Sequence, residues 1–305
     1  MFSILQPQTP NNMASIKINS LSKTYPNGVK ALDDVSLEIQ NGMFGLLGPN
    51  GAGKSSLMRT LATLQEADEG SVKFDEIDML NQPIEVRKIL GYLPQEFGVY
   101  PRVTAEQLLD HVAILKGISN KGERKELVKY LLQKVNLYDK RNKSVKGFSG
   151  GMKQRVGIAQ ALIGNPRLII VDEPTAGLDP GERNRFHNLL ADVGEDVIVI
   201  LSTHIVDDVR ELCSEFAIMN LGRIVYKGSP SAALNELKGQ VWMKLVEREE
   251  LDHLKTIHEV ISDKMVAGKP QIHVLSDTNP GDGFTSVEPN LEDVFFVKTN
   301  QPEIV

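Results

Sequence analysis

Short apolar runs recur along the first two thirds of the chain, and most precede a stretch with the spacing of an amphipathic helix. The runs at 43–47, 168–171 and 197–201 are almost wholly apolar, which is typical of strands buried on both faces of a parallel sheet. The pattern therefore predicts an α/β core. Further short strands are predicted within 14–39, around a turn at Pro26, Asn27 and Gly28, and at 70–74 and 89–93.

A helical insertion is predicted after the strand at 89–93. Thr104 and Gln107 have the spacing of a capping box, which starts a helix. A second helix follows, and the insertion is expected to end near Ser144. The predicted inner faces carry Leu108, Leu109, Val112 and Leu115 in the first helix, and Leu127, Leu131, Leu132 and Val135 in the second.

The composition changes after Gly228. A strand at 241–246, a helix near 251–257 and a strand at 271–275 predict a small α+β appendage, which is followed by a Pro/Gly-rich loop. Both a role in dimerisation and a role in regulation stay open for this appendage.

A glycine-rich turn follows the run at 43–47, and Leu57, Leu61 and Leu64 come after it at helical spacing. The turn matches G-x-x-x-x-G-K-[ST] in full. Glycines let the backbone close around a phosphate chain, the lysine adds charge for the terminal phosphates, and the hydroxyl suits Mg²⁺. A plain glycine turn is the alternative, but a chance match at all fixed positions is rare, so we predict a nucleoside triphosphate site. Its residues are Gly48, Pro49, Asn50, Gly51, Ala52, Gly53, Lys54, Ser55 and Ser56.

The run at 168–171 ends in two acids, Asp172 and Glu173. Ligands of open parallel sheets bind outside the carboxyl ends of the strands, so these acids should share an edge with the glycine-rich turn. Asp172 is predicted to hold Mg²⁺, and Glu173 to take a proton from a water that attacks the γ-phosphate. A solvated acidic turn is the weaker alternative beside the glycine motif.

Other polar residues have two interpretations on the sequence alone. Ser149, Gly150 and Gly151 open a predicted helix that is either a second anion site or only a capped helix. Asp179 before Pro180 is good helix capping, and the helix after it carries Phe186, Leu189, Leu190 and Val193 on its inner face. Tyr25 could stack on an adenine ring or simply pack at a strand end. His204 could contact the γ-phosphate or be an ordinary loop residue. Gln95, taken alone, is a solvated loop amide.

Length and composition narrow the class of protein. The 305 residues suit one large domain with an appendage, and the net charge of -6 lacks the basic footprint of a nucleic-acid binder. Cys213, the single cysteine, fits a small core residue on the apolar face of a helix and a reducing compartment. No apolar run reaches the roughly 18 residues of a membrane-spanning helix. Residues 1–13 are expected to be a loose tail and not a signal peptide, with either Met1 or Met13 as the natural start.

Together these motifs resemble those of the ATP-binding-cassette (ABC) transporter ATPases. The resemblance spans residue 25 to about residue 228 and implies a P-loop core with a mixed β-sheet, an antiparallel β subdomain and a helical subdomain. The motifs stand in the family's order: the P-loop, a glutamine loop at Gln95, a signature at 148–152, the acids at 172–173, a loop at 176–179 and a switch histidine at His204. The implied domains are an ABC domain at 14–228, with its helical subdomain at about 96–160, and an accessory region at 229–305.

The resemblance implies roles that spacing cannot show. Gln95 would contact Mg²⁺ and relay the nucleotide state to a membrane subunit, Glu173 would polarise the attacking water with His204 beside the γ-phosphate, and Tyr25 would stack on adenine. Ser149, Gly150 and Gly151 would close over ATP held by a second copy, in a two-fold dimer. Asp179 joins the nucleotide-binding residues, and Lys54 is expected to act in catalysis.

Two features point to one branch of the family. The family's signature usually ends in glutamine, whereas this chain has Met152, which cannot make the amide's hydrogen bonds. A related pattern occurs in the multidrug and polyketide-exporter branch. The segment at 290–296 is similar to an element that closes the ATPases of type-2 ABC exporters, although a plain amphipathic helix explains it equally well.

The leading hypothesis is an ATP-hydrolysing subunit, peripheral on the cytoplasmic face of the cell membrane, that drives export through a separately encoded permease. ATP and Mg²⁺ are the expected ligands, and a homodimer or heterodimer of ATPase subunits the expected assembly. A soluble ABC ATPase that acts on nucleic acid or ribosomes is the alternative, but the acidic balance and single cassette disfavour it. A small-molecule P-loop kinase would leave the helix at Ser149 and His204 unexplained.

Overall fold

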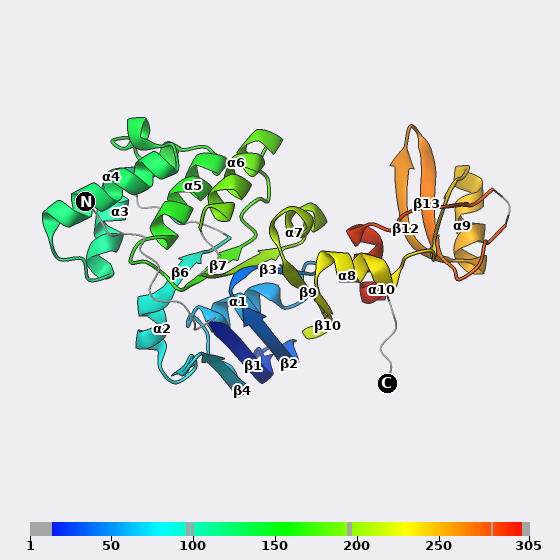
Figure 1. The fold of residues 1–305 in the computed structure, drawn as a ribbon, viewed down its shortest axis with the longest axis horizontal. Coiled ribbons are helices and arrows are strands. Elements are labelled where there is room, and N and C mark those ends of the chain that lie inside the picture. The colour runs from blue at the N-terminus through cyan, green and yellow to red at the C-terminus, as the bar shows by residue number, and fades with distance from the viewer. Residues whose placement is uncertain (1–13, 96–97, 99–100, 194–196, 282, 301–305) are drawn as a thin grey trace.

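The computed structural model describes residues 14–95, 98, 101–193, 197–281 and 283–300 (Figure 1). The predicted tail at 1–13 lies outside the described residues. An antiparallel sheet with the strand order β2-β1-β4-β5 begins the chain. Alternation in β1 and β2 buries Ile16, Ile18 and Leu37 and leaves polar neighbours outside. The strands are β1 (Ser15–Thr24), β2 (Lys30–Gln40), β4 (Glu69–Phe74) and β5 (Ile77–Asp78).

A six-stranded sheet with the order β10-β9-β3-β8-β7-β6 forms the centre of the molecule. Its neighbours are parallel except for β10, which pairs antiparallel with β9. Every residue of β7 and β8 is buried, which confirms the prediction of strands covered on both faces. The strands are β3 (Gly42–Leu47), β6 (Leu90–Leu93), β7 (Leu168–Asp172), β8 (Ile198–Thr203), β9 (Glu215–Asn220) and β10 (Arg223–Gly228).

Different elements cover the two faces of this central sheet. Leu57 and Met58 of α1 pack with the antiparallel sheet against one face, in the same cluster as Ile170 and Ile200. The helices α5, α6 and α7 pack on the other face, in a cluster with Ile169. The central sheet therefore separates α1 from α5. The helices are α1 (Lys54–Leu61), α2 (Pro83–Ile89), α5 (Gly150–Ala161), α6 (Pro180–Ala191) and α7 (Val206–Leu212).

The predicted helical insertion contains α3 (Ala105–Leu115) and α4 (Lys121–Lys134), followed by the 3₁₀ turns η1 (Tyr138–Lys140) and η2 (Val145–Gly147). The capping box at Thr104 and Gln107 is confirmed. The prediction that Leu115 faces inward is wrong, since 73% of the residue's surface is exposed. The buried face of α3 is formed by Ala105, Leu109 and Ala113, which are four residues apart. Leu115 is out of phase with this spacing and therefore points away from the core.

The predicted helical position of Leu64 is also wrong. The α1 helix ends at Leu61, and Leu64 lies beyond it with 62% of its surface exposed. The chain turns at Thr63, which has a positive φ of 60°, so the apolar spacing of Leu57 and Leu61 does not continue.

The C-terminal part has its own antiparallel sheet, with the order β12-β13-β11-β14, and its last helix returns to the main body (Figure 1). Val294 and Val297 of α10 join the cluster that holds Val209 and Phe216. The Asn220 side-chain amide also donates to the Thr299 carbonyl over 3.1 Å. The elements are α8 (Pro230–Glu236), β11 (Val241–Leu245), α9 (Arg248–Ile257), β12 (Glu259–Val266), β13 (Lys269–Leu275), β14 (Thr285–Ser286) and α10 (Leu291–Asn300).

Candidate active site

The glycine-rich turn joins the carboxyl end of β3 to the start of α1. Gly53 stands at the N-cap of α1 in the left-handed region, with φ at 106°, and no side chain caps the helix. A Cβ atom at Gly53 would collide with the Ala31 carbonyl, and one at Gly48 would collide with the Met219 carbonyl. The first turn contains no acidic residue, so its backbone N–H groups form an anion-binding end of the helix.

Lys54 is folded back over this turn. Its Nζ donates to the carbonyls of Gly48 at 2.7 Å and Pro49 at 3.1 Å and lies 3.6 Å from Oε1 of Glu173. Burial lowers the pKa of Lys54, and the negative charge of Glu173 opposes that shift. The ammonium is held where a bound phosphate would meet both it and the N-terminus of α1.

Asp172 ends β7 and is 3% exposed. Burial raises the pKa of its carboxyl, while the nearby hydroxyls of Ser202 and Ser55 pull it the other way. Its Oδ1 is buried and accepts no hydrogen bond from any residue that the structure describes. A buried oxygen without a donor is costly, and a hard cation would satisfy it.

The donors around Asp172 suit magnesium bound together with a nucleotide. Within the described ranges, no group of three or more His, Cys, Asp or Glu side chains could hold a metal ion by itself. Mg²⁺ usually binds through one or two protein oxygens, substrate phosphates and water. Asp172 and the Ser55 hydroxyl at the start of α1 fit that requirement, so they are the residues that would hold the ion.

Glu173 brings three other predicted residues together. Its Oε2 accepts a hydrogen bond from Nε2 of Gln95 at 3.0 Å and lies 3.3 Å from Nδ1 of His204, while Oε1 faces Lys54. Its backbone has φ at 47°, in the left-handed region, and is held by an amide hydrogen bond to the Ser202 carbonyl at 2.9 Å. This carboxylate is placed to accept a proton from a water at the phosphate end of the P-loop.

Tyr25 lies beside the first turn of α1. Its hydroxyl is 3.0 Å from Oγ of Ser56 and donates to Oε1 of Gln65 at 2.8 Å. The ring is half-buried and borders the P-loop, although it comes from the turn between β1 and β2. Gln65 was not predicted, because its contact with Tyr25 depends on pairing far along the chain.

Two predicted elements do not join this cluster within one chain. Ser149 is exposed, and its hydroxyl accepts from the amide of Met152, in its own helix, at 3.3 Å. Asp179 is also exposed and accepts from the amide of Glu182 at 2.8 Å. Since α5 packs on the opposite face of the central sheet from α1, Ser149 is not brought to Lys54 of the same molecule.

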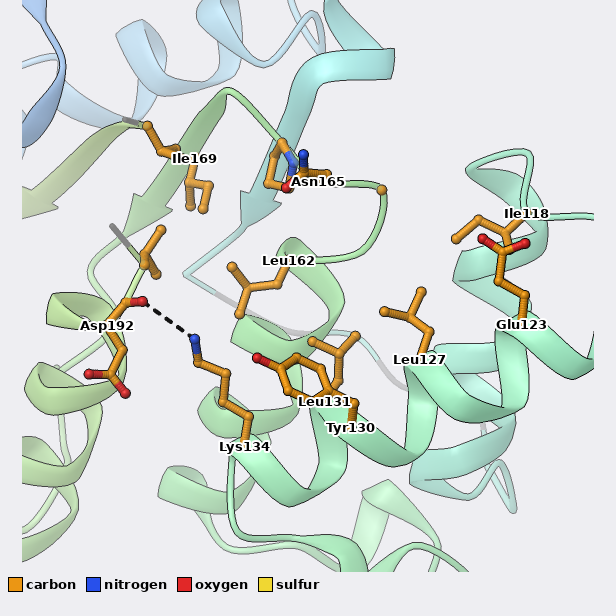
Figure 2. A pocket seen from close by; sticks show the side chains of 14 residues that line it. Ile118, Glu123, Leu127, Tyr130, Leu131, Lys134, Leu162, Asn165, Ile169 and Asp192 are labelled. Carbon is orange, nitrogen blue, oxygen red and sulfur yellow. Dashed lines mark hydrogen bonds between the residues drawn. The ribbon is translucent and has the colours of Figure 1, made fainter. Parts of the chain in front are cut away.

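A hollow of about 340 Å³ lies near the amino ends of strands β7 and β8, away from the carboxyl ends that carry Asp172 and His204 (Figure 2). It is bounded by α4, by the segment after α5 and by the start of β7, and Lys134 donates across it to the Asp192 carbonyl over 3.4 Å. None of the predicted site residues lines it, so it is separate from the phosphate site. Its lining includes Glu123, Leu127, Tyr130, Leu131, Lys134, Leu162, Asn165, Ile169 and Asp192.

The chain matches a family model described as "ABC transporter" over residues 32–176. It is 39% identical over 204 residues to the ABC transporter ATP-binding protein NatA of Bacillus subtilis (strain 168), covering 66% of this chain and 82% of NatA. It is 32% identical to the probable multidrug ABC transporter ATP-binding protein YbhF of Escherichia coli (strain K12), covering 93% of this chain and 52% of YbhF. The methionine import ATP-binding protein MetN of Helicobacter hepaticus (strain ATCC 51449 / 3B1) is also 32% identical, covering 85% of this chain and 77% of MetN.

Solved structures give the same picture of the fold. A dimeric, post-hydrolysis structure of the ATP-binding cassette MJ0796, bound to ADP and Pi, aligns with a TM-score of 0.64 and 29% identity. The alignment covers 70% of this chain and 98% of that cassette. In the part of our chain that the structure describes, no helix has both the length and the apolar character needed to cross a bilayer.

Proposed function

Because this chain belongs to the ABC transporter family and is one of its ATP-hydrolysing, ATP-binding proteins, we propose that it powers export through a separately encoded membrane permease. The observation that carries the ATPase assignment is the meeting of Lys54, Gln95 and His204 on the carboxylate of Glu173, beside an uncapped helix that starts at a glycine turn. That set combines an anion site with a general base.

We assign the residues around the nucleotide as follows. Lys54 and the amides of the P-loop bind the β- and γ-phosphates, and Glu173 takes the proton of the attacking water while His204 contacts the γ-phosphate. When bound, Mg²⁺ neutralises phosphate charge. Gln95, together with Asp172 and Ser55, would hold the ion and would transmit the nucleotide state to the permease. Tyr25 would stack on adenine from beside Ser56.

The second half of the site comes from another copy of the chain. Ser149, Gly150 and Gly151 present an exposed helix start, and Asp179 caps a second exposed turn. We propose that these groups close over ATP held by the P-loop of a partner ATPase subunit, either identical or related. Such a two-fold arrangement uses the same two surfaces twice and closes on itself.

The direction of transport and the domain limits are further parts of the proposal. The match to the multidrug protein YbhF extends over 93% of this chain, beyond the cassette at 14–228 and its helical part at about 96–160, into the accessory region at 229–305. The match to the import protein MetN covers 85% of this chain and therefore also extends past the cassette, so the proposal of export rests on the resemblance of Met152 and the segment at 290–296 to the exporter branch. The subunit would then sit on the cytoplasmic face of the membrane against its permease.

Glu173→Gln tests the ATPase assignment. The variant should bind ATP about as tightly as the wild type, lose about 10³-fold in hydrolysis, and elute as a dimer with ATP in size-exclusion chromatography. Glu85→Gln, at an exposed ion pair on α2, is the matched control and should behave like the wild type. A Glu173→Gln protein that hydrolyses ATP normally, or that stays monomeric with ATP, would contradict the assignment.

The transport part has a separate test. Membranes that contain the permease should recruit this subunit in the presence of ATP and stimulate its hydrolysis. Absence of both effects would remove the transport proposal and leave the ATPase assignment in place.

A further inference from the structure

Asp208 is a fully buried carboxylate on α7, four residues after His204. Neither the sequence motifs nor the proposed site uses it. Its carboxylate oxygens accept hydrogen bonds from the hydroxyls of Thr175 at 2.6 Å and Thr203 at 2.9 Å and from Nε of Arg183 at 2.9 Å. They also lie 2.9 Å from Nε2 of His187.

The two oxygens of this carboxylate bind different parts of the fold. Thr175 and Thr203 both donate to Oδ2. Arg183 and His187, from α6, both meet Oδ1, and the other ring nitrogen of His187 lies 3.0 Å from Oε2 of Glu211. Oδ2 therefore joins the segment after β7 to the end of β8, and Oδ1 joins both of these to helix α6.

The loops that meet at Oδ2 carry the proposed catalytic groups. Thr175 follows Glu173 by two residues, and Thr203 directly precedes His204 at the end of β8. The backbone of Glu173 is held in the left-handed region by its hydrogen bond to the Ser202 carbonyl. Asp208 holds the chain just after Glu173, through Thr175, and the same oxygen also holds Thr203 next to His204.

Helix α6, which contacts Oδ1, begins at Asp179, one of the residues proposed to act on the nucleotide of a partner subunit. Arg183 lies in the first turn of α6, whose N-cap is Asp179. A buried carboxylate is tolerated only where its partners are in place, so a displacement of α6 or of either loop breaks several hydrogen bonds together. Apolar side chains could fill the same space, but they would not fix the relative positions of α6 and the two segments as hydrogen bonds do.

We propose that Asp208 is a positioning residue for ATP hydrolysis, which holds Glu173 and His204 in register with each other and with the start of α6. This inference rests on the proposed function of Glu173 and His204. Asp208 itself touches neither nucleotide nor water in this account, because it acts through Thr175, Thr203 and Arg183.

Steady-state hydrolysis and equilibrium ATP binding by the full chain test this role. Asp208→Asn and Thr175→Val should each lower kcat by about tenfold or more and change the Kd for ATP by less than about twofold, because misplaced catalytic groups slow chemistry more than binding. Thr175→Ser keeps the hydroxyl and should restore kcat to within about twofold of the wild type. Asp207→Asn removes an exposed carboxylate of the same helix, which pairs with Arg210, and is the matched control.

If Asp208→Asn fails to fold, the variants Thr175→Val and Thr175→Ser test the positioning role by themselves. A folded Thr175→Val protein with wild-type kcat would overturn the inference, as would equal losses of kcat and ATP affinity that Thr175→Ser does not restore. Wild-type protein that binds ATP without hydrolysing it would instead refute the proposed function itself. Wild-type hydrolysis together with an unimpaired Thr175→Val variant would refute only the positioning role.

Discussion

The starts of helices α1 and α5 have similar backbone chemistry, but they differ in the side chains that surround them. Both follow glycine-containing sequence, and neither has an acidic residue in its first turn. The start of α1 has a buried lysine, two buried acids and a histidine around it. The start of α5 offers an exposed serine whose hydroxyl bonds its own helix, on the opposite face of the central sheet.

In the proposed function, the start of α1 is a nearly complete site and the start of α5 is half of one. A phosphate at α1 would meet backbone N–H groups, a cation and a metal-binding acid from a single chain. A phosphate at Ser149 would meet the serine hydroxyl and the N-terminus of α5. The second end is therefore expected to work only when another molecule brings its own P-loop to it.

Removal of the cation at α1 should have the largest effect. Lys54→Ala is expected to weaken ATP binding by about 100-fold, because it deletes the charge that faces the terminal phosphates. Isothermal titration calorimetry of the purified protein measures the change. Lys88→Ala, which removes an exposed lysine paired with Glu85, is the control and should bind ATP normally. Unchanged affinity in Lys54→Ala would mean that the P-loop is not the primary site.

A disruption at α5 should separate binding from hydrolysis. Ser149→Arg is expected to leave ATP affinity of the monomer within about threefold, since Ser149 is remote from Lys54 in one chain, and to lower hydrolysis by about 10²-fold. The same calorimetry and a phosphate-release assay report the two effects. If ATP affinity falls as much as in Lys54→Ala, the two helix starts belong to one site in a single molecule, which would contradict a site shared between two copies.

The smallest effect is expected at Met152. Its side chain is partly buried against the helical core that includes Val156, and its backbone amide, which any residue provides, bonds Ser149. Met152→Gln, which restores the family's usual residue, should therefore change kcat by less than about threefold. A change above tenfold in the same phosphate-release assay would show that this side chain acts directly at the nucleotide.

Local patterns predicted the core and the main cluster. Continuous apolar runs marked β3, β7 and β8, and the rule that ligands bind at the carboxyl ends of parallel strands placed Asp172 and Glu173 with the P-loop. The structure does bring Lys54, Gln95 and His204 to Glu173. Their chemical roles stay predictions, because no ligand contact tests them.

Contacts between distant segments could not be predicted in this way. The return of α10 to the cassette depends on Val294 and Val297 meeting residues far upstream. Helix α8, by contrast, has a local signal that could have predicted it, since Ser229 caps the helix directly before Pro230. Asp208 stands as one acid among several on α7. Only the arrival of Thr175, Arg183 and His187 from other elements distinguishes it from its exposed neighbour Asp207.

The chain is well suited to a direct cross-linking test. Its single cysteine, Cys213, is buried, and burial raises the pKa of its thiol to about 12. Because the reactive form is the thiolate, Cys213 should stay inert near neutral pH in the folded protein. Cysteines introduced at exposed positions would therefore react selectively.

The most direct measurement joins the two helix starts across two molecules. Asn50→Cys and Ser149→Cys are introduced separately into Glu173→Gln protein, and the two proteins are mixed under mild oxidation. A covalent dimer of one Asn50→Cys and one Ser149→Cys chain should form with ATP and Mg²⁺ and be absent with ADP. No cross-link with ATP, or an equal yield without nucleotide, would contradict the claim that ATP is bound between the P-loop of one copy and the Ser149 helix of another.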